Sequence, residues 1–316
     1  MQCERAGMEK MFYAPGLRAV AEDALISGAV VHGHGFYVYP NFVVGRLTRR
    51  RGLPLVYHPH GMFEPWILGR SRWKKRMAHW LFEGANFRHV RLWRALTRKE
   101  AEQVRAVVGP AARIVVAPNG MDLAPVRMAT FSRANGRRRA LFLGRLHPKK
   151  GLRLLIQAWA RMAGEAKDWE LVVAGPDENG HEAEVRQWVR ETGLDGSVSF
   201  VRAVSGPSKY ELIASADLFV LTSYSEGLPM APLEAMAAGV PVLLTDACNL
   251  PEALAAGAGW VGSADQISVT KQLRAALSAG DTELRQRGAA GRELVERSFS
   301  WRNTVATLHA ACQEIA

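Results

Sequence analysis

Two glutamates, Glu226 and Glu234, lie in an otherwise apolar stretch of the sequence with seven residues between them. Continuous apolar runs flank the stretch at 218–221 and 240–244, as is typical of parallel strands buried on both faces. The pattern predicts a strand, a loop, a helix and a second strand. Glu226 would lie in the loop before the helix and Glu234 about two turns along it.

The residues around the two glutamates fit this unit and suggest a ligand for it. Pro229 or Pro232 suits the first turn of the helix, where a missing N–H costs nothing, and Gly239 is suited to end it. Gly227 allows close approach of the backbone to a ligand, and free N–H groups beyond it form an anion site. Carboxylates beside such a site suit a ligand that carries both hydroxyls and phosphates.

A second candidate element runs from Gly144 to Gly151, after an apolar run and before a helical pattern. Its Arg145 and Lys150 can hold a diphosphate from two sides, because arginine supplies a planar fork of donors and lysine a mobile point charge. Lys149 is more typical of a solvated residue. The alternative for the whole element is a solvated basic loop.

These motifs together resemble the donor site of the group 1 (family 4) glycosyltransferases. The resemblance rests on Ser-Glu-Gly-Leu-Pro at 225–229, on Glu-Ala-Met-Ala-Ala-Gly at 234–239 and on Gly144-Arg145 with Lys150-Gly151. It implies the GT-B fold, which is α/β with two Rossmann-like parallel-sheet domains that face each other across a cleft. It also implies a retaining, metal-independent enzyme that uses a nucleotide sugar.

The resemblance implies a role for each candidate residue. Glu226 would contact the transferred sugar, and Glu234 would accept hydrogen bonds from the nucleotide ribose. The diphosphate would lie against the side chains of Arg145 and Lys150. Backbone groups of four further residues would face the donor: Gly144, Gly227, Leu228 and Pro229. The alternative is that Glu226 is a solvated loop residue and Glu234 lies on the exposed edge of its helix.

Histidines mark the N-terminal half, in Val31-His-Gly-His-Gly and in Pro59-His60-Gly61. The resemblance implies that His60 faces the cleft near the transferred sugar, where a neutral imidazole could bond a hydroxyl or stabilise charge on the leaving group. The alternative is a structural hydrogen bond to backbone. His32, His34 and His58 could suggest a metal, but no carboxylate or cysteine completes a ligand set, so no metal site is expected.

Alternation of strand and helix patterns predicts two domains, an acceptor-side domain at 1–134 and a donor-binding domain at 135–316. The polar stretch 132–139 is a candidate linker between them. In the family, the last helix crosses back onto the first domain. Family members also begin with a further strand and Gly-rich loop on the acceptor side, so the N-terminal domain is expected to be shortened.

Positive charge is concentrated in one segment. Between Arg46 and Arg105 there are 15 Lys or Arg and four Glu, and this surplus accounts for the formal net charge of +11. An anionic partner is implied: a membrane surface, a lipid-linked diphosphate or nucleic acid. No nucleic-acid-binding motif accompanies the charge, so nucleic acid is not expected. Three scattered cysteines and no signal-peptide pattern favour a reduced, cytoplasmic setting.

Within this basic segment, residues 70–82 mix Lys and Arg with Trp73, Trp80 and aliphatic residues. Peripheral docking on anionic lipid at the inner membrane face is one interpretation. The other is a solvated helix that packs its tryptophans inward.

The principal hypothesis is a glycosyltransferase that moves a sugar from a nucleotide diphosphate sugar to a carbohydrate or lipid-linked acceptor, in polysaccharide or glycolipid biosynthesis. The resemblance favours a UDP- or GDP-sugar as donor and requires no further cofactor. The alternative is a catalytically impaired nucleotide-sugar-binding or scaffolding protein, which would bind the donor without transferring the sugar.

Overall fold

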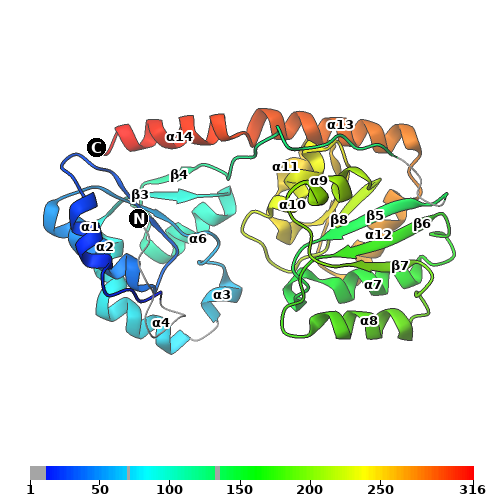
Figure 1. The fold of residues 1–316 in the computed structure, drawn as a ribbon, viewed down its shortest axis with the longest axis horizontal. Helices are drawn as coiled ribbons and strands as arrows, with labels where there is room; N and C mark the ends of the chain where they lie inside the picture. Colours follow the sequence, from blue (N-terminus) through cyan, green and yellow to red (C-terminus); the bar gives the residue numbers. More distant parts are fainter. Residues whose placement is uncertain (1–11, 70–71, 132–135) are drawn as a thin grey trace. The chain divides into compact units, whose positions relative to one another are not determined.

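The computed structural model describes residues 12–69, 72–131 and 136–316. The chain forms two compact units, each built on a parallel sheet (Figure 1). The N-terminal unit comprises Met1–Pro118 and Thr304–Ala316, and the C-terminal unit comprises Asn119–Asn303.

The expected boundary between residues 134 and 135 therefore falls inside the C-terminal unit. Residues 121–131 belong to that unit because their backbone bonds to it. The N–H of Met121 donates to the carbonyl of Phe299, and the N–H of Ala129 donates to that of Ala238. Residues 132–135 of the candidate linker lie outside the described residues, and Arg138 and Arg139 at its other end already belong to a strand.

The N-terminal unit holds a four-stranded parallel sheet in the order β1-β2-β3-β4. The strands are β1 (Val31–His34), β2 (Leu55–His58), β3 (Val90–Ala95) and β4 (Ile114–Val116). The helices are α1 (Leu17–Ala24), α2 (Tyr39–Arg51), α3 (Pro65–Gly69), α4 (Arg72–Ala78), the π-helix η2 (His79–Glu83), α5 (Gly84–His89) and α6 (Arg98–Val108).

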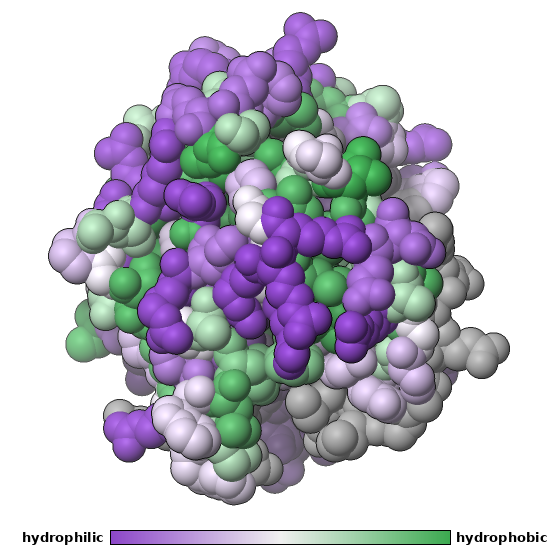
Figure 2. Space-filling view, turned by 90° about the vertical axis from the view of Figure 1, so that its left-hand side faces the viewer, coloured by the Kyte–Doolittle hydropathy of each residue, from purple (hydrophilic) through white to green (hydrophobic). Residues whose placement is uncertain are grey.

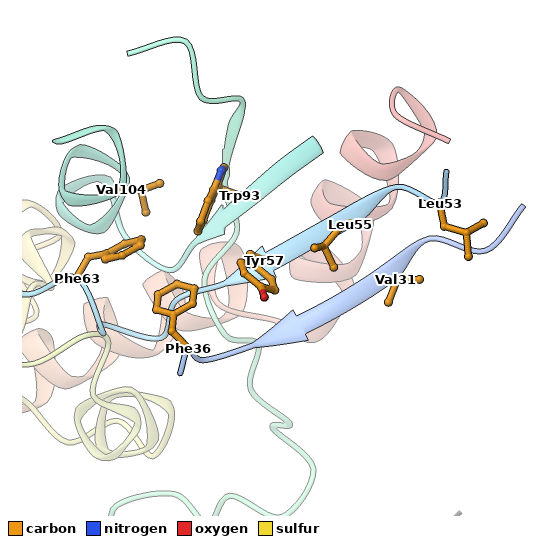
Figure 3. Packing of buried hydrophobic residues seen from close by; sticks show 8 residues of the cluster. All are labelled: Val31, Phe36, Leu53, Leu55, Tyr57, Phe63, Trp93 and Val104. Carbon is orange, nitrogen blue, oxygen red and sulfur yellow. The ribbon is translucent and has the colours of Figure 1, made fainter. Parts of the chain in front are cut away.

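Aromatic side chains fill the core of this unit (Figure 3). The rings of Phe36 and Phe63 stack with centroids 4.7 Å apart, and Trp93 lies edge-on to Tyr57 at 5.7 Å. The Tyr57 hydroxyl donates to the buried Glu83 carboxylate at 2.9 Å, so the one polar atom that Tyr57 brings into the core is satisfied. This core fixes the carboxyl ends of β1 and β2, where the histidines lie.

The strand β3 was missed by the sequence analysis, because its Val-Arg-Leu-Trp-Arg-Ala pattern contains two arginines. Arg94 is nevertheless buried, since its guanidinium donates to the carbonyls of Ala117 and Pro118, both at 2.8 Å. A charged residue is tolerated in the interior when its donors are satisfied in this way.

The C-terminal unit holds a six-stranded parallel sheet in the order β10-β9-β8-β5-β6-β7. Its strands are β5 (Arg138–Leu143), β6 (Trp169–Ala174), β7 (Val198–Val201), β8 (Leu218–Leu221), β9 (Val242–Thr245) and β10 (Gly259–Gly262). The α-helices are α7 (Leu152–Arg161), α8 (His181–Glu191), α9 (Gly206–Ala214), α10 (Met230–Ala237), α11 (Pro251–Ala255), α12 (Gln266–Leu277) and α13 (Asp281–Ser298), and the 3₁₀ turns are η3 (Pro148–Lys150) and η4 (Asp246–Cys248).

Helices cover both faces of this sheet. The helices α7, α8 and α12 pack together on one face, and α9, α10 and α13 pack together on the other (Figure 1). The strand order reverses between β5 and β8, which is the doubly wound arrangement whose ligands bind where the order switches. The loops that follow β5 and β8 are therefore expected to form the site.

The last helix, α14 (Trp301–Gln313), belongs to the N-terminal unit from Thr304 onward. The Thr304 hydroxyl donates to the Pro118 carbonyl at 2.9 Å, and Arg113 forms an ion pair with Glu314. Among residues 12–69, 72–131 and 136–316, no helix has both the length and the apolar character that a membrane span requires.

Candidate active site

The loops after β5 and β8 meet at the carboxyl edge of the C-terminal sheet, and two backbones come into contact there. Gly151 has φ of +69°, and a Cβ at this position would lie 1.9 Å from the carbonyl oxygen of Thr222. The Thr222 hydroxyl donates to the Gly151 carbonyl at 2.9 Å, and the N–H of Tyr224 donates to the Lys149 carbonyl. Only glycine fits this approach, which fixes Lys150 over the β8 loop.

Lys150 and Glu226 form an ion pair at this junction. The Lys150 Nζ lies 2.7 Å from Glu226 Oε1, and the two side chains are only 16% and 11% exposed. The Ser223 hydroxyl donates to the same carboxylate oxygen at 2.5 Å. The Lys150 side chain also passes close to Gly144, since its Cε would lie 3.9 Å from a Cβ built there. The predicted residues Gly144, Lys150 and Glu226 thus lie close together.

Residues that follow β9 hold the loop that carries Glu226. The Asn249 side-chain amide donates to the Glu226 carbonyl, and the N–H of Glu226 donates to the Ala247 carbonyl at 2.9 Å. Asn249 itself has a positive φ of 55°, which asparagine tolerates better than most residues. Glu226 is thus a buried and positioned carboxylate, and the alternative of a solvated loop residue is wrong.

Glu234 forms a second ion pair, with Lys209 of α9. The Lys209 Nζ lies 2.7 Å from Glu234 Oε1, and the Glu234 side chain is 14% exposed. Burial lowers the pKa of Lys209, but the hydrogen bond and negative charge of Glu234 outweigh it and raise the pKa overall. The alternative of an exposed helix edge for Glu234 is therefore wrong.

The helix α10 begins where the prolines predict. Pro229 occupies the N-cap position in an extended conformation, and Pro232 lies in the first turn. Gly239 has φ of +77° immediately after the helix and ends it. Gly227 and Leu228 precede the first turn, so the backbone N–H groups at the start of α10 lie next to them.

Gly144 and Arg145 lie beside this cluster with other partners. The N–H of Gly144 donates to the Ala174 carbonyl at 3.0 Å, so it is not free for a phosphate. The close backbone approach here requires glycine at residue 175 and not at residue 144: a Cβ on Gly175 would lie 1.9 Å from the Gly144 carbonyl oxygen, whereas a Cβ on Gly144 would meet no atom closer than 3.8 Å. Arg145 is 63% exposed and forms an ion pair with Glu178. Its assignment to the diphosphate stays a prediction.

In the N-terminal unit, four histidines gather at the carboxyl ends of β1 and β2. Parallel pairing brings His34 opposite His58. Nδ1 of His32 lies 2.8 Å from Nε2 of His58, and Nδ1 of His34 lies 2.8 Å from Nε2 of His60. The rings of His34 and His58 stack with centroids 4.3 Å apart.

All four rings are biased toward the neutral form. Burial lowers the pKa of His58 to about 2, with further lowering by His34 and the Arg94 guanidinium. Burial, His34 and Arg94 lower the pKa of His60 to about 4. Burial also lowers the pKa of His32 and His34. Neutral rings can both donate and accept hydrogen bonds, as the predicted role of His60 requires.

Glu100 holds the His60 loop. His60 is exposed and has a positive φ of 52°, and Gly61 follows with φ of 78°. The buried Glu100 carboxylate accepts hydrogen bonds from the N–H groups of Gly61, at 2.5 Å, and Leu96, at 2.6 Å. Burial raises the pKa of Glu100, while these two hydrogen bonds lower it, and the net shift is upward. The carboxylate thus locks an unusual backbone conformation.

The ligating nitrogens of His34, His58 and His60 lie within 4.8 Å of one another, close enough to share a metal ion. Two features oppose this. Nδ1 of His34 and Nε2 of His60 are already hydrogen-bonded to each other at 2.8 Å, so a shared metal would have to replace this bond. A guanidinium nitrogen of Arg94 lies 3.4 Å from His58 and would repel a cation. Absence of a metal stays a prediction.

Comparison with known families bears on the carboxylate–lysine cluster. Residues 128–293, which contain both carboxylate–lysine pairs, match the family described as "Glycosyl transferases group 1". Residues 6–120 match the "Glycosyl transferase 4-like domain". The chain belongs to the group 1 glycosyl transferases. It is a retaining, nucleotide-sugar-dependent glycosyltransferase, as the donor-site resemblance implied.

Several known proteins are similar to this glycosyltransferase. A GDP-mannose:cellobiosyl-diphosphopolyprenol alpha-mannosyltransferase of Xanthomonas campestris is 28% identical over 285 residues, which are 89% of this chain and 73% of that protein. A D-inositol 3-phosphate glycosyltransferase of Kribbella flavida is 32% identical over 235 residues, 69% of this chain and 55% of that protein.

Among solved structures, Anabaena HepE in complex with UDP and glucose aligns with a TM-score of 0.77 at 19% identity, covering 96% of this chain and 81% of that one. The alignment confirms the predicted GT-B fold.

Sequence reasoning missed Lys209 and Ser223 in the C-terminal unit and Glu100 in the N-terminal unit. Lys209 lies 25 positions before its partner Glu234, and no local pattern links the two. Glu100 carried a signal, because Thr97 and Glu100 match the spacing of a helix capping box. That pattern predicts a bond within the helix start, not the contact with Gly61.

Proposed function

We propose that the enzyme transfers a sugar from a UDP- or GDP-sugar to a carbohydrate or lipid-linked acceptor, in polysaccharide or glycolipid biosynthesis. The donor classes are supported by the name of the Xanthomonas relative, which uses GDP-mannose, and by the Anabaena structure with UDP. The diphosphopolyprenol acceptor of the same relative supports the lipid-linked class.

The observation that carries this proposal is the pair of lysine–carboxylate contacts at the switch point of the sheet, Lys150 with Glu226 and Lys209 with Glu234. Half-buried charges are stable there because each is paired. A donor offers phosphates to the lysines and hydroxyls to the carboxylates. The donor can therefore replace the partner of each lysine and of each carboxylate, and no charge is left without a partner.

Each part of the donor then has a partner. Lys150 and Arg145 hold the diphosphate, and Arg145 exchanges Glu178 for a phosphate oxygen. Glu226 accepts hydrogen bonds from hydroxyls of the transferred sugar, and Glu234 accepts them from the ribose. The start of α10, with Gly227 and Leu228 before it, turns backbone N–H groups and its helix dipole toward negative charge.

Catalysis follows from where charge develops. As the glycosidic bond to the phosphate breaks, negative charge accumulates on the diphosphate and oxocarbenium character on the sugar. Lys150 is already placed by Gly151 and needs little reorganisation to stabilise that leaving group. His60, which carries a neutral ring on a locked loop, donates a hydrogen bond to the sugar or to the leaving group.

The acceptor class suggests a place of action. A lipid-linked acceptor lies at a membrane, and the basic segment 46–105 provides peripheral contact with it. The enzyme then works in the cytoplasm, at the inner membrane face.

A transfer assay with UDP- and GDP-sugars tests the proposal. Glu226→Ala and Lys150→Ala are expected to lower transfer by at least about 100-fold, since each removes a charged group from the reacting centre. Glu252→Ala, which removes an exposed glutamate of α11, is a control and is expected to leave transfer unchanged.

Near-normal transfer in folded Glu226→Ala or Lys150→Ala protein would contradict the assignment of the site. Donor binding without transfer to any acceptor would instead favour the scaffolding alternative. Circular dichroism of each variant separates loss of chemistry from loss of fold.

A further inference from the structure

The helical segment α4–η2 exposes large apolar side chains on one face of the N-terminal unit. Trp80 is 83% exposed, Trp73 66%, Leu81 59% and Met77 51%. The spacing of four residues from 73 to 77 and from 77 to 81 brings these side chains to one side of the helix. We call these four residues the Trp73–Leu81 surface.

The opposite side of the same segment is anchored in the unit. Glu83 is fully buried and accepts hydrogen bonds from the Tyr57 hydroxyl at 2.9 Å and from the N–H of Tyr37 at 3.2 Å. The ring of Phe82 packs against Phe42 with centroids 5.5 Å apart. The interpretation that this helix packs its tryptophans inward is therefore wrong for Trp73 and Trp80. Arg70 and Ser71, which precede the helix, lie outside the described residues.

Exposed charge within segment 46–105 is mostly positive, because the acidic residues of the segment are largely buried. Three of its four glutamates, Glu64, Glu83 and Glu100, are buried, which leaves Glu102 exposed. Exposed basic residues of the segment include Arg76 on α4, together with Arg46, Arg50, Arg51, Arg88, Arg91, Arg98, Lys99 and Arg105. The segment therefore presents more exposed positive than negative charge, although Arg51 lies beside Glu22 of α1 and donates to its carbonyl at 2.8 Å.

We propose that the Trp73–Leu81 surface docks this enzyme on an anionic lipid bilayer. Tryptophan suits the boundary between headgroups and acyl chains, because its ring is apolar and its N–H stays hydrated. Met77 and Leu81 reach deeper, while Arg76 and the other exposed basic residues meet anionic headgroups. The inference rests on the peripheral contact proposed above and identifies the element and the lipid class that provide it.

The N-terminal unit as a whole presents a mixed surface. The helix α4 lies at the lower edge of the N-terminal unit in Figure 1. Figure 2 views this end of the molecule and shows clusters of hydrophilic side chains interrupted by hydrophobic ones. Such a mixture suits a peripheral contact, in which apolar side chains insert only about 5–10 Å while charges remain at the headgroups.

Co-sedimentation with vesicles tests the inference. The wild-type protein is expected to bind vesicles of mixed phosphatidylcholine and phosphatidylglycerol, and to bind pure phosphatidylcholine at least about tenfold more weakly. Added salt is expected to weaken the binding, because it screens surface charge. Trp80→Ala is expected to lower the affinity at least about tenfold, and Arg76→Ala about fivefold.

Matched controls come from the C-terminal unit. Leu254 of α11 is 57% exposed, close to the 59% of Leu81, so Leu254→Ala removes the same side chain from an equally exposed place. Leu81→Ala is expected to weaken vesicle binding and Leu254→Ala to leave it unchanged. Equal effects of the two substitutions, or no vesicle binding by the wild-type protein at low salt, would overturn the inference.

The vesicle experiment uses neither donor nor acceptor. If the docking surface is assigned wrongly, Trp80→Ala leaves vesicle binding unchanged and nucleotide binding intact. If the donor site is assigned wrongly, vesicles still bind and nucleotides do not. The two failures are therefore distinguishable.

Discussion

At the residue scale, the C-terminal unit pairs each of its two candidate carboxylates with a lysine from another element. Lys150 follows β5 and meets Glu226 after β8, while Lys209 of α9 meets Glu234 of α10. A charge left alone at such half-buried positions would cost several kcal/mol, so the partners keep the site assembled before a donor arrives. The donor can then exchange partners in a preformed site, with little need to build one.

The histidines of the N-terminal unit make stability depend on pH. The folded pKa of His58 is about 2, below the value of about 6.5 for an unfolded histidine. As the pH falls below about 6.5, the unfolded chain takes up a proton that the folded protein refuses, and the free energy of unfolding decreases. Between pH 7 and pH 5 we expect His58 to account for a loss of up to about 2 kcal/mol.

Urea unfolding followed by tryptophan fluorescence at both pH values measures this loss. His58→Gln, which cannot take up the proton, is expected to show a smaller difference between pH 7 and pH 5. A difference as large as that of the wild-type protein would contradict the assigned role of His58.

At the element scale, the site depends on backbone contacts between loops. Gly151 brings the η3 turn against the β8 loop, Asn249 holds the same loop from the side of β9, and Glu100 of α6 locks the His60 loop. Each contact joins elements that are distant in the sequence. The side chains that do the proposed chemistry are thus held in place by residues outside the predicted set.

Gly151→Ala tests this dependence. A Cβ at residue 151 would lie 1.9 Å from a backbone oxygen in a conformation with positive φ, so both loops must move. We expect the free energy of unfolding to fall by at least about 2 kcal/mol. Gly164→Ala is the control, because a Cβ there meets nothing within 4 Å. Equal stability of the two variants would contradict the close approach.

Local patterns predicted the elements of the site well. The strand at 218–221 lies where the apolar run indicates, and the helix that carries Glu234 begins at the predicted prolines. These features depend on neighbouring residues, which the sequence shows directly. The pairing of Lys209 with Glu234 and the buried position of Arg94 depend on contacts across the fold, so no spacing in the sequence predicted them. The interpretation that Trp73 and Trp80 point inward is wrong for the same reason, because burial also depends on contacts across the fold.

At the scale of the whole molecule, the two units carry different groups. The C-terminal unit carries the carboxylate–lysine cluster on a doubly wound sheet. The N-terminal unit carries the histidines, the basic segment and the Trp73–Leu81 surface. This division fits a group 1 glycosyltransferase whose donor is water-soluble and whose proposed acceptor is held in a membrane. That the N-terminal domain is shortened stays a prediction.

Calorimetric titration shows whether Glu234 and its neighbours form a nucleotide site. UDP, GDP and ADP are titrated into the wild-type protein, Glu234→Ala and the control Glu252→Ala, with EDTA present throughout. We predict that UDP or GDP binds the wild type and Glu252→Ala equally, without a metal. Glu234→Ala should bind it about 10- to 100-fold more weakly, because a charged hydrogen-bond acceptor is lost. Failure of every nucleotide to bind folded wild-type protein, or equal binding by Glu234→Ala, would mean that Glu234 does not belong to a nucleotide site.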